Sequence, residues 1–337
     1  MFGLSYRLPT IIDKRLQDPH IVIIGAGASK AACATDKNGN VVPLLRNIHE
    51  VLGLTDKLRS YGFSEDELSN FELLFSSING KSEYADLQRE LEDAVRNYFQ
   101  KFMIPDGVTL YDYLVLSLTE KDAIISFNWD PFLIQAYGRN IDVGNLPQLI
   151  FPHGNVGVGI CYDCKTKGYA NSLCNKCFEP FSDMPLLFPV GKKNYNDNSI
   201  IEGEWNIARH YLGRAAGVTI FGYSAPETDV EAYELLKSSY QKSNITIIAP
   251  FTIINLAKNE QEQKAKWQDI YDNRMIQYTD DFRNTILWKS PRVSLETVFD
   301  AVLQQQPRPV EKSFKNFDTL EDLQSFVQTI DEFDMAI

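Results

Sequence analysis

The sequence contains no apolar run long enough to cross a membrane as a helix, and Met1 to Arg15 lacks the charged-then-apolar pattern of a secretory signal. Basic residues are also few: 33 Lys and Arg stand against 45 Asp and Glu, for a net charge of −12. Because phosphate contacts need clustered Lys and Arg, this balance disfavours direct nucleic-acid binding. The sequence therefore predicts a cytoplasmic protein with no membrane contact, and its 337 residues suffice for one large domain or two modest ones.

Short apolar segments alternate with helical patterns along most of the chain. His20 to Ile24 is rich in β-branched residues and stops at a glycine, which is typical of a buried strand in a parallel sheet. We predict further strands at 123–127, 148–151, 217–221 and 245–249, and helices at 82–103, 201–215 and 228–241. This alternation predicts an α/β fold with a doubly wound, Rossmann-like parallel sheet.

The C-terminal tail, from Gln306, begins with two prolines and then becomes amphipathic. The apolar residues that share one helical face there are Leu320, Leu323, Phe326, Val327 and Ile330. Such a stripe usually packs on its own domain, which we favour, although an oligomer contact would need the same pattern. We predict one catalytic domain over 1–305, with a helical insertion at about 50–118, and a helical tail over 306–337.

Cysteine is rare but concentrated. Of the five cysteines, four form two Cys-x-x-Cys pairs, Cys161 with Cys164 and Cys174 with Cys177. Each pair can clamp one side of a tetrahedral Zn²⁺, and four thiolates leave no open position for water. We therefore predict a structural zinc knuckle at about 157–182. Cys33 stands apart and is expected to be a small buried hydrophobe.

A glycine turn, Gly25-Ala-Gly-Ala-Ser29, follows the first strand directly. Glycines in this position let the backbone approach a pyrophosphate, and the next helix offers its free N–H groups to the anion. The dehydrogenase fingerprint has a third glycine where this chain has Lys30, so hydride transfer is disfavoured. The alternative is a tight strand-to-helix turn that binds nothing.

Polar residues stand at the ends of three more predicted strands, where open α/β sheets bind ligands. Asn128 and Asp130 follow one of them and lie on the same side of an extended segment. His153, one of four histidines, follows the next and suits a general base because its pKa is near neutrality. Gly222-Tyr-Ser224 ends a third. From position alone, a lone histidine such as His153 more often makes a structural hydrogen bond than it serves as a catalyst.

These pieces, in this order, resemble the sirtuin family over Ile21 to Pro250. That family carries a Gly-Ala-Gly-x-Ser turn, an Asn-x-Asp segment, a His-Gly, two Cys-x-x-Cys pairs and a later Gly-x-Ser turn. The resemblance implies NAD as the substrate that is cleaved. It also extends to Pro43 to Arg46, which is similar to a family loop that covers the cofactor.

The resemblance implies a role for each matching position. The turn of Gly25, Ala26, Gly27, Ala28 and Ser29 would hold the pyrophosphate. Asn128 would contact the nicotinamide ribose, Asp130 the carboxamide, and His153 would be the general base. Gly222, Tyr223 and Ser224 would line the adenosine side.

The chain departs from the protein deacylases of that family. The stretch Met184 to Asn194 lacks their Phe-Gly-Glu, and Ala225 to Asp229 is more like divergent bacterial sirtuin-like proteins that deplete NAD in anti-phage defence. We therefore expect an NAD glycohydrolase that produces nicotinamide and ADP-ribose under the control of a trigger or partner protein. The alternatives are a protein-lysine deacylase and a non-catalytic NAD or ADP-ribose sensor. The 82–103 helix and the tail from Lys312 are candidate surfaces for a partner or a homo-oligomer.

Overall fold

A computed structural model describes residues 6–7, 18–44, 47–188, 198–225, 230–240, 251–255, 260–271, 276–293, 295 and 312–334. Its main sheet has six strands in the order β10 (Ile276–Thr279), β9 (Phe251–Ile254), β8 (Gly217–Phe221), β2 (His20–Ile24), β3 (Ala123–Ser126) and β4 (Gln148–Ile150). All neighbours in it are parallel. The strand predicted at 245–249 lies outside the described residues, and the next described strand is β9.

The chain winds the sheet in two directions from its centre. It runs from β2 outward to β3 and β4, and then returns to the other side of β2 for β8, β9 and β10. The order therefore reverses between β2 and β8, and a crevice opens at the carboxyl ends of the strands at such a point. This arrangement confirms the predicted doubly wound fold. The centre of the sheet is dry because every side chain of β2, β3 and β8 is buried.

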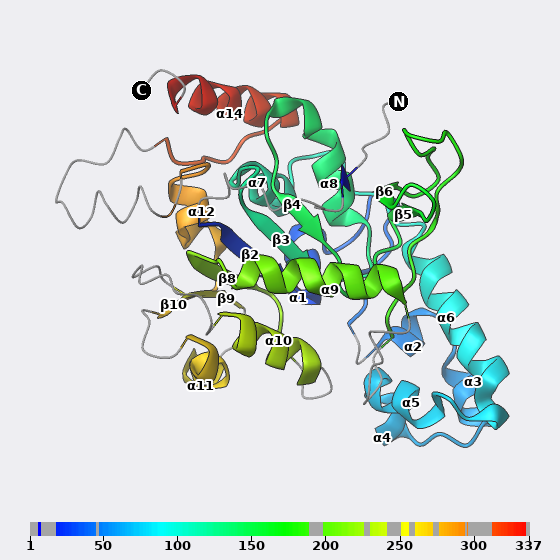
Figure 1. Cartoon of the computed structure of the whole chain (residues 1–337). Coiled ribbons are helices and arrows are strands. Elements are labelled where there is room, and N and C mark those ends of the chain that lie inside the picture. Colours follow the sequence, from blue (N-terminus) through cyan, green and yellow to red (C-terminus); the bar gives the residue numbers. More distant parts are fainter. Residues whose placement is uncertain are drawn as a thin grey trace.

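Helices cover both faces of the main sheet (Figure 1). The helices α9 (Ser199–Leu212), α10 (Val230–Tyr240) and α11 (Glu260–Tyr271) form one layer. On the other face lie α1 (Ala26–Ala32), α7 (Leu110–Leu116) and α8 (Phe132–Arg139), with α12 (Ile286–Lys289) at its margin. None of the helices in the described ranges is both long and apolar enough to span a bilayer.

A group of short helices projects to one side of the sheet, at the lower right of Figure 1. It contains α2 (Ile48–Val51), α3 (Thr55–Ser60), α4 (Glu65–Leu68), α5 (Phe71–Ile78) and α6 (Ala85–Phe99). The predicted helix at 82–103 is α6, preceded by a 3₁₀ turn at Ser82–Tyr84. Its apolar stripe of Leu87, Leu91, Val95 and Phe99 is buried within the chain, so this stripe does not form an exposed assembly surface.

A second, four-stranded antiparallel sheet lies beside the main one. Its order is β1 (Tyr6–Arg7), β6 (Thr166–Tyr169), β5 (Val158–Cys161) and β7 (Ser182–Asp183). We call residues 158–183 the knuckle. The sequence showed little periodicity there, because strands of two to four residues are too short to display a pattern.

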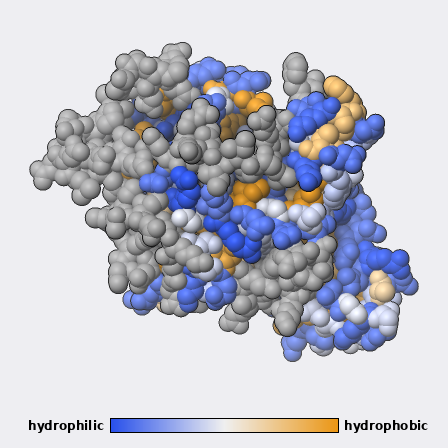
Figure 2. All heavy atoms as spheres, viewed as in Figure 1, coloured by the Kyte–Doolittle hydropathy of each residue, from blue (hydrophilic) through white to orange (hydrophobic). Residues whose placement is uncertain are grey.

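The tail helix α14 (Leu320–Asp334) packs on its own domain, as favoured from the sequence. Leu323 and Val327 are fully buried, and Gln324 Nε2 donates hydrogen bonds to the Arg139 carbonyl oxygen at 2.8 Å and to Asn140 Oδ1 at 3.0 Å. The exposed apolar side chains lie elsewhere. Leu173 and Phe178 on the knuckle are 53% and 74% exposed, and Figure 2 shows an apolar patch over this part of the molecule.

Candidate functional site

A cavity of about 430 Å³ opens at the carboxyl edge of the main sheet. Its floor consists of the turns that follow five parallel strands, β2, β3, β4, β8 and β9. The residues from these turns that line it are Gly25, Ala26, Gly27, Phe127, Asn128, Trp129, Asp130, His153, Gly222, Tyr223, Ser224 and Asn255. Its roof comes from Val42, Pro43, Leu44, Ile48 and Leu187, together with Glu72 of α5 and Phe99 of α6. The structure thus brings nine of the eleven predicted catalytic and cofactor-binding residues to one cavity, which lies at the topological switch point.

Two glycine turns lie against each other on this floor. The Gly25 N–H donates to the Phe221 carbonyl at 3.1 Å, and the Gly27 N–H donates to the Gly222 carbonyl at 3.0 Å. A Cβ on Gly27 would lie 2.8 Å from the Gly222 carbonyl oxygen, and one on Gly222 would lie 2.2 Å from the Ala28 nitrogen. Gly222 also has a φ of +60°. These glycines are required because the two backbones touch.

Ala28 and Ser29 lie behind the cavity wall, since both are fully buried and neither lines the cavity. The Ser29 hydroxyl donates to Asp130 Oδ2 at 2.7 Å and lies 2.7 Å from the Tyr111 hydroxyl. It also accepts a hydrogen bond from Asn128 Nδ2 at 2.9 Å. The structure therefore places Ser29 as the residue that orients Asn128 and Asp130, and not at the cavity surface.

Asn128 is held in one orientation by its amide nitrogen. Nδ2 donates to the Gly25 carbonyl at 2.8 Å as well as to Ser29, so Oδ1 is the atom that remains to accept a hydrogen bond from a ligand. A buried neighbour, Asn155, donates from Nδ2 to the carbonyl oxygens of Asn128 at 3.0 Å and Asp130 at 2.6 Å. These bonds fix the turn that carries both side chains.

Burial raises the pKa of Asp130 to about 6. Hydrogen bonds from the Ser29 hydroxyl and the Phe132 backbone N–H favour the carboxylate and oppose this shift without cancelling it. A carboxyl group whose pKa lies this close to neutrality is typical of functional sites.

Replacement of Asp130 by asparagine is expected to stabilise the fold near pH 8. The folded protein binds the Asp130 proton more tightly than the unfolded chain does, so this group favours folding most below its unfolded pKa of about 3.9. That contribution is lost as the pH rises through about 6. D130N should therefore exceed the wild type by up to roughly 3 kcal/mol near pH 8, with the difference shrinking towards pH 4. Denaturant unfolding at both pH values measures this difference in the free energy of unfolding. A D130N variant that is less stable than the wild type at both pH values would contradict this account.

His153 lies on the same cavity, beyond the end of β4. It is 8% exposed, and its ring meets that of Phe127 edge-on with the centroids 4.7 Å apart. Its carbonyl accepts a hydrogen bond from the Leu187 N–H at 2.9 Å. The next residue, Gly154, has a φ of +75°, and a Cβ there would lie 2.0 Å from the Pro185 carbonyl oxygen. The segment 184–188 is therefore fitted closely against the His153 turn.

No family model and no curated protein matches this chain. The chain is similar to a structure from a study of sirtuin substrate affinity, with 18% identity, 78% of this chain and 89% of the other covered, and a TM-score of 0.41. It is also similar to a Sir2 homologue in complex with NAD, with 14% identity, 80% and 86% covered, and a TM-score of 0.40.

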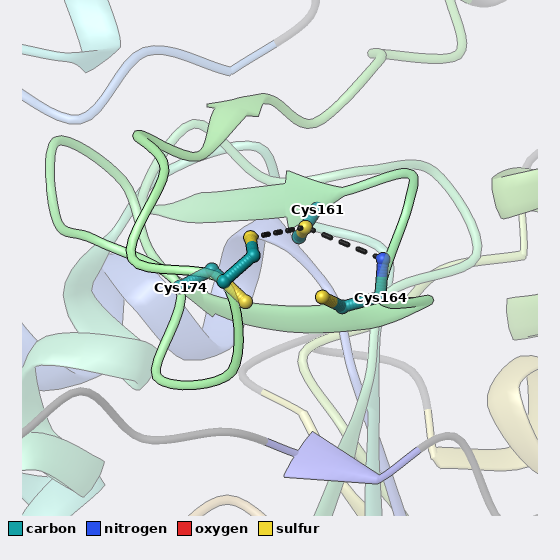
Figure 3. A group of neighbouring side chains, drawn as sticks. Cys161, Cys164 and Cys174 are labelled. Carbon is teal, nitrogen blue, oxygen red and sulfur yellow. Dashed lines mark hydrogen bonds between the residues drawn. The ribbon is translucent and has the colours of Figure 1, made fainter.

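The four knuckle cysteines form a candidate metal centre. The sulfur atoms of Cys161, Cys164, Cys174 and Cys177 all lie within 4.8 Å of one another. Figure 3 shows three of them converging from the β5 turn and the following loop. Tetrahedral zinc with Zn–S bonds of about 2.3 Å holds its sulfur ligands about 3.8 Å apart. The Sγ atoms of Cys161 and Cys177 lie 3.6 Å apart. The donor set fits Zn²⁺ as predicted. Cys33 is buried away from this centre.

Several residues of the site gave no recognisable signal in the sequence. Tyr111 and Asn155 belong to segments without a motif, and they lie near Asn128 only in the fold. Trp129 could have been suspected from its place between Asn128 and Asp130. Its indole N–H is buried and has no hydrogen-bond partner among the described residues, although the residue lines the cavity.

Some of the sequence predictions fall on residues that the structure does not describe. Arg46 of the expected covering loop is one, and the others are 189–194 and 226–229 of the two divergent stretches. Pro43 and Leu44, from the same loop as Arg46, do line the cavity.

Proposed function

We propose that this protein is an NAD glycohydrolase that cleaves NAD to nicotinamide and ADP-ribose. The observation that carries the proposal is the convergence of Asn128, Asp130 and His153 on one cavity whose floor is a pair of touching glycine turns. Glycine turns without side chains admit a diphosphate close to the backbone. The three polar side chains are suited to the other end of the substrate, where the glycosidic bond breaks.

The reaction breaks the bond between C1′ of the ribose and the ring nitrogen of nicotinamide. The bonding electron pair stays on that nitrogen, so neutral nicotinamide leaves and the ribose becomes oxocarbenium-like. Oxygen of a water molecule then attacks C1′ and gives up a proton. An enzyme assists by fixing the leaving group, orienting the water and accepting that proton.

Each residue has a proposed part in this reaction. Asp130 would accept a hydrogen bond from the carboxamide N–H₂ of nicotinamide. Asn128 Oδ1, which its amide nitrogen aims by binding Gly25 and Ser29, would accept from the water or a ribose hydroxyl. His153 would take the proton, either directly or from the ribose hydroxyl. The apolar surroundings of the cavity would strengthen each of these contacts.

The test is NAD cleavage by the purified chain, with and without an acetyl-lysine peptide. We expect nicotinamide and ADP-ribose to form without peptide, and His153→Ala and Asn128→Ala to lower the rate by about 10² to 10⁴, the range for removal of a positioned acid, base or electrostatic contact. An exposed glutamate on the helical insertion, Glu83, supplies a control in Glu83→Gln, which should retain the full rate. Cleavage that depends strictly on peptide would instead identify a deacylase, and binding without turnover in any condition would leave either a missing trigger or a non-catalytic sensor.

We further propose that the hydrolase is a regulated effector of the anti-phage type. Unrestrained loss of NAD would harm the cell that makes the enzyme, so activity has to await a trigger, a partner protein or assembly. The apolar stripes of α6 and α14, which the sequence offered as candidate surfaces for such a partner, are buried within the chain. Neither stripe is therefore exposed for assembly. The cleavage expected of the purified chain is therefore a basal rate, and steady full activity of the purified monomer with no addition would contradict this regulation without affecting the hydrolase assignment.

A further inference from the structure

We propose that Glu72, on the helical insertion, is a further residue of this site that stabilises positive charge on the nicotinamide-ribose half of the substrate. This inference rests on the proposed function and adds a residue that no sequence motif indicates. Glu72 lines the same cavity as Asn128 and His153, although it comes from a different part of the fold. It is only 7% exposed.

The backbone holds Glu72 in place over the cavity. It lies in the first turn of α5, where Asn70 Oδ1 accepts hydrogen bonds from the N–H groups of Glu72 at 3.1 Å and Leu73 at 3.3 Å. The neighbours Phe71 and Phe75 on α5 are buried in the core. A turn anchored in this way keeps the backbone of Glu72 at the cavity, so only its side chain has to be ordered when a ligand binds.

The helix α5 is also connected to the segment that carries Asn128 and Asp130. Phe75 stacks on Phe188 with the ring centroids 4.9 Å apart, and Phe188 packs on Trp129 at 5.0 Å. Trp129 is the residue between Asn128 and Asp130. The roof and the floor of the cavity are therefore joined by three aromatic rings, which fix α5, and with it the backbone of Glu72, against the segment that carries Asn128 and Asp130.

The character of the lining makes the carboxylate of Glu72 distinctive. The other roof residues are apolar: Val42, Pro43, Leu44, Ile48, Phe99 and Leu187. Among the described lining residues, Glu72 and Asp130 are the only acidic ones, and none is Lys or Arg. A carboxylate that is largely shielded from solvent interacts strongly with a charge that a ligand brings into the same cavity, because little water screens it.

The charges of NAD decide which half Glu72 can face. A carboxylate repels the diphosphate, which the glycine turns on the floor can accept, and it attracts the pyridinium ring. During cleavage the positive charge moves from the ring nitrogen to C1′ and O4′ of the ribose. A fixed carboxylate beside this half stabilises the charge throughout and stabilises the transition state most if it lies closer to the ribose than to the ring.

The test compares two probes that differ in charge at this position. Carba-NAD⁺, in which a methylene replaces the ribose ring oxygen, keeps the pyridinium and is not cleaved, whereas ADP-ribose lacks the cation. For Glu72→Gln we expect carba-NAD⁺ binding to weaken roughly tenfold, ADP-ribose binding to stay within about twofold, and kcat to fall by about 10². The charge-matched control Glu83→Gln, on the exposed surface of the same insertion, should change none of these values.

The outcomes separate this inference from the proposed function. Suppose the wild type cleaves NAD but Glu72→Gln weakens the binding of carba-NAD⁺ and of ADP-ribose equally, or changes neither. The proposed charge role of Glu72 is then wrong, and the hydrolase assignment stands. If the wild type neither binds the probes nor cleaves NAD, both fall. Should Glu72→Gln lower the melting temperature below that of the assay, Glu72→Asp and Glu72→Asn replace it, because they share one length and differ in charge. The preference for carba-NAD⁺ should then survive in Glu72→Asp alone.

Discussion

Removal of zinc is expected to unfold the knuckle and to stop NAD cleavage. The knuckle has little core of its own: the buried apolar group around the metal centre consists of Cys161, Cys174 and Phe181. Structural zinc contributes on the order of 10 kcal/mol or more to folding in small metal-dependent modules, so this one should not persist without it. Four thiolates that converge within 4.8 Å would also repel one another.

The loss should reach the cavity through one segment of chain. The Met184 N–H donates to the Val158 carbonyl at 3.1 Å, and the Leu187 N–H donates to the His153 carbonyl at 2.9 Å. The segment 184–188 thus connects β5 of the knuckle to the His153 turn. When the knuckle unfolds, this segment loses its attachment to β5, and the wall of the cavity beside His153 loosens.

Metal analysis, thermal unfolding and NAD cleavage before and after chelation measure these effects. We expect one zinc per chain in the wild type and none in Cys174→Ser, together with a lower melting temperature and loss of activity. Cys33→Ala is the matched control, because Cys33 is also buried but lies outside the cluster, and it should keep its zinc. A zinc-free protein with unchanged melting temperature and rate would show that the four cysteines have another role.

Loss of the Lys167 charge is expected to destabilise the fold by about 3 to 5 kcal/mol, the usual effect of breaking a buried ion pair. Lys167 Nζ donates to Glu204 Oε1 at 2.8 Å and to the Leu149 carbonyl at 2.9 Å, and both side chains are almost fully buried. Glu204 Oε2 accepts a hydrogen bond from the Phe151 N–H at 2.7 Å. The pair therefore ties β6 and α9 to the end of β4, two residues before His153.

A double variant distinguishes the charge from the packing. Lys167→Met leaves the Glu204 carboxylate buried without its cation, whereas Lys167→Met combined with Glu204→Gln removes both charges and keeps an acceptor for the Phe151 N–H. The double variant should recover most of the lost stability in urea unfolding. Lys101→Met, on an exposed lysine, supplies the control and should be neutral. If the double variant were as unstable as the single one, the loss would come from packing around the lysine stem.

The strongest sequence signals were local ones, and these predictions were confirmed. The apolar runs at His20 to Ile24 and Gly217 to Phe221 form β2 and β8 with those bounds, because a buried parallel strand needs apolar residues on both faces. The two Cys-x-x-Cys pairs form one cluster, because that spacing permits each pair to clamp one ion. The alternation of strands and helices predicted the doubly wound sheet correctly.

Weaker elements escaped the sequence because they have no periodicity of their own. The knuckle strands contain two to four residues and are held by pairing and by the metal centre. The helix predicted at 82–103 is shorter, since α6 ends at Phe99 and the chain must then turn to place Phe102 in the core. The strand β10 was not predicted, because its residues are only partly buried and include polar ones.

By itself, the sequence determined the class of fold, the cysteine cluster and the group of residues at the strand ends, because short-range patterns encode each of them. Only the tertiary structure decided what those residues contact. It placed Ser29 behind the wall as the residue that orients Asn128 and Asp130, and it brought Glu72 over the cavity from a segment far away in the chain. Such contacts depend on how α5 and the sheet pack together, and no local pattern records the packing of segments that are distant in sequence.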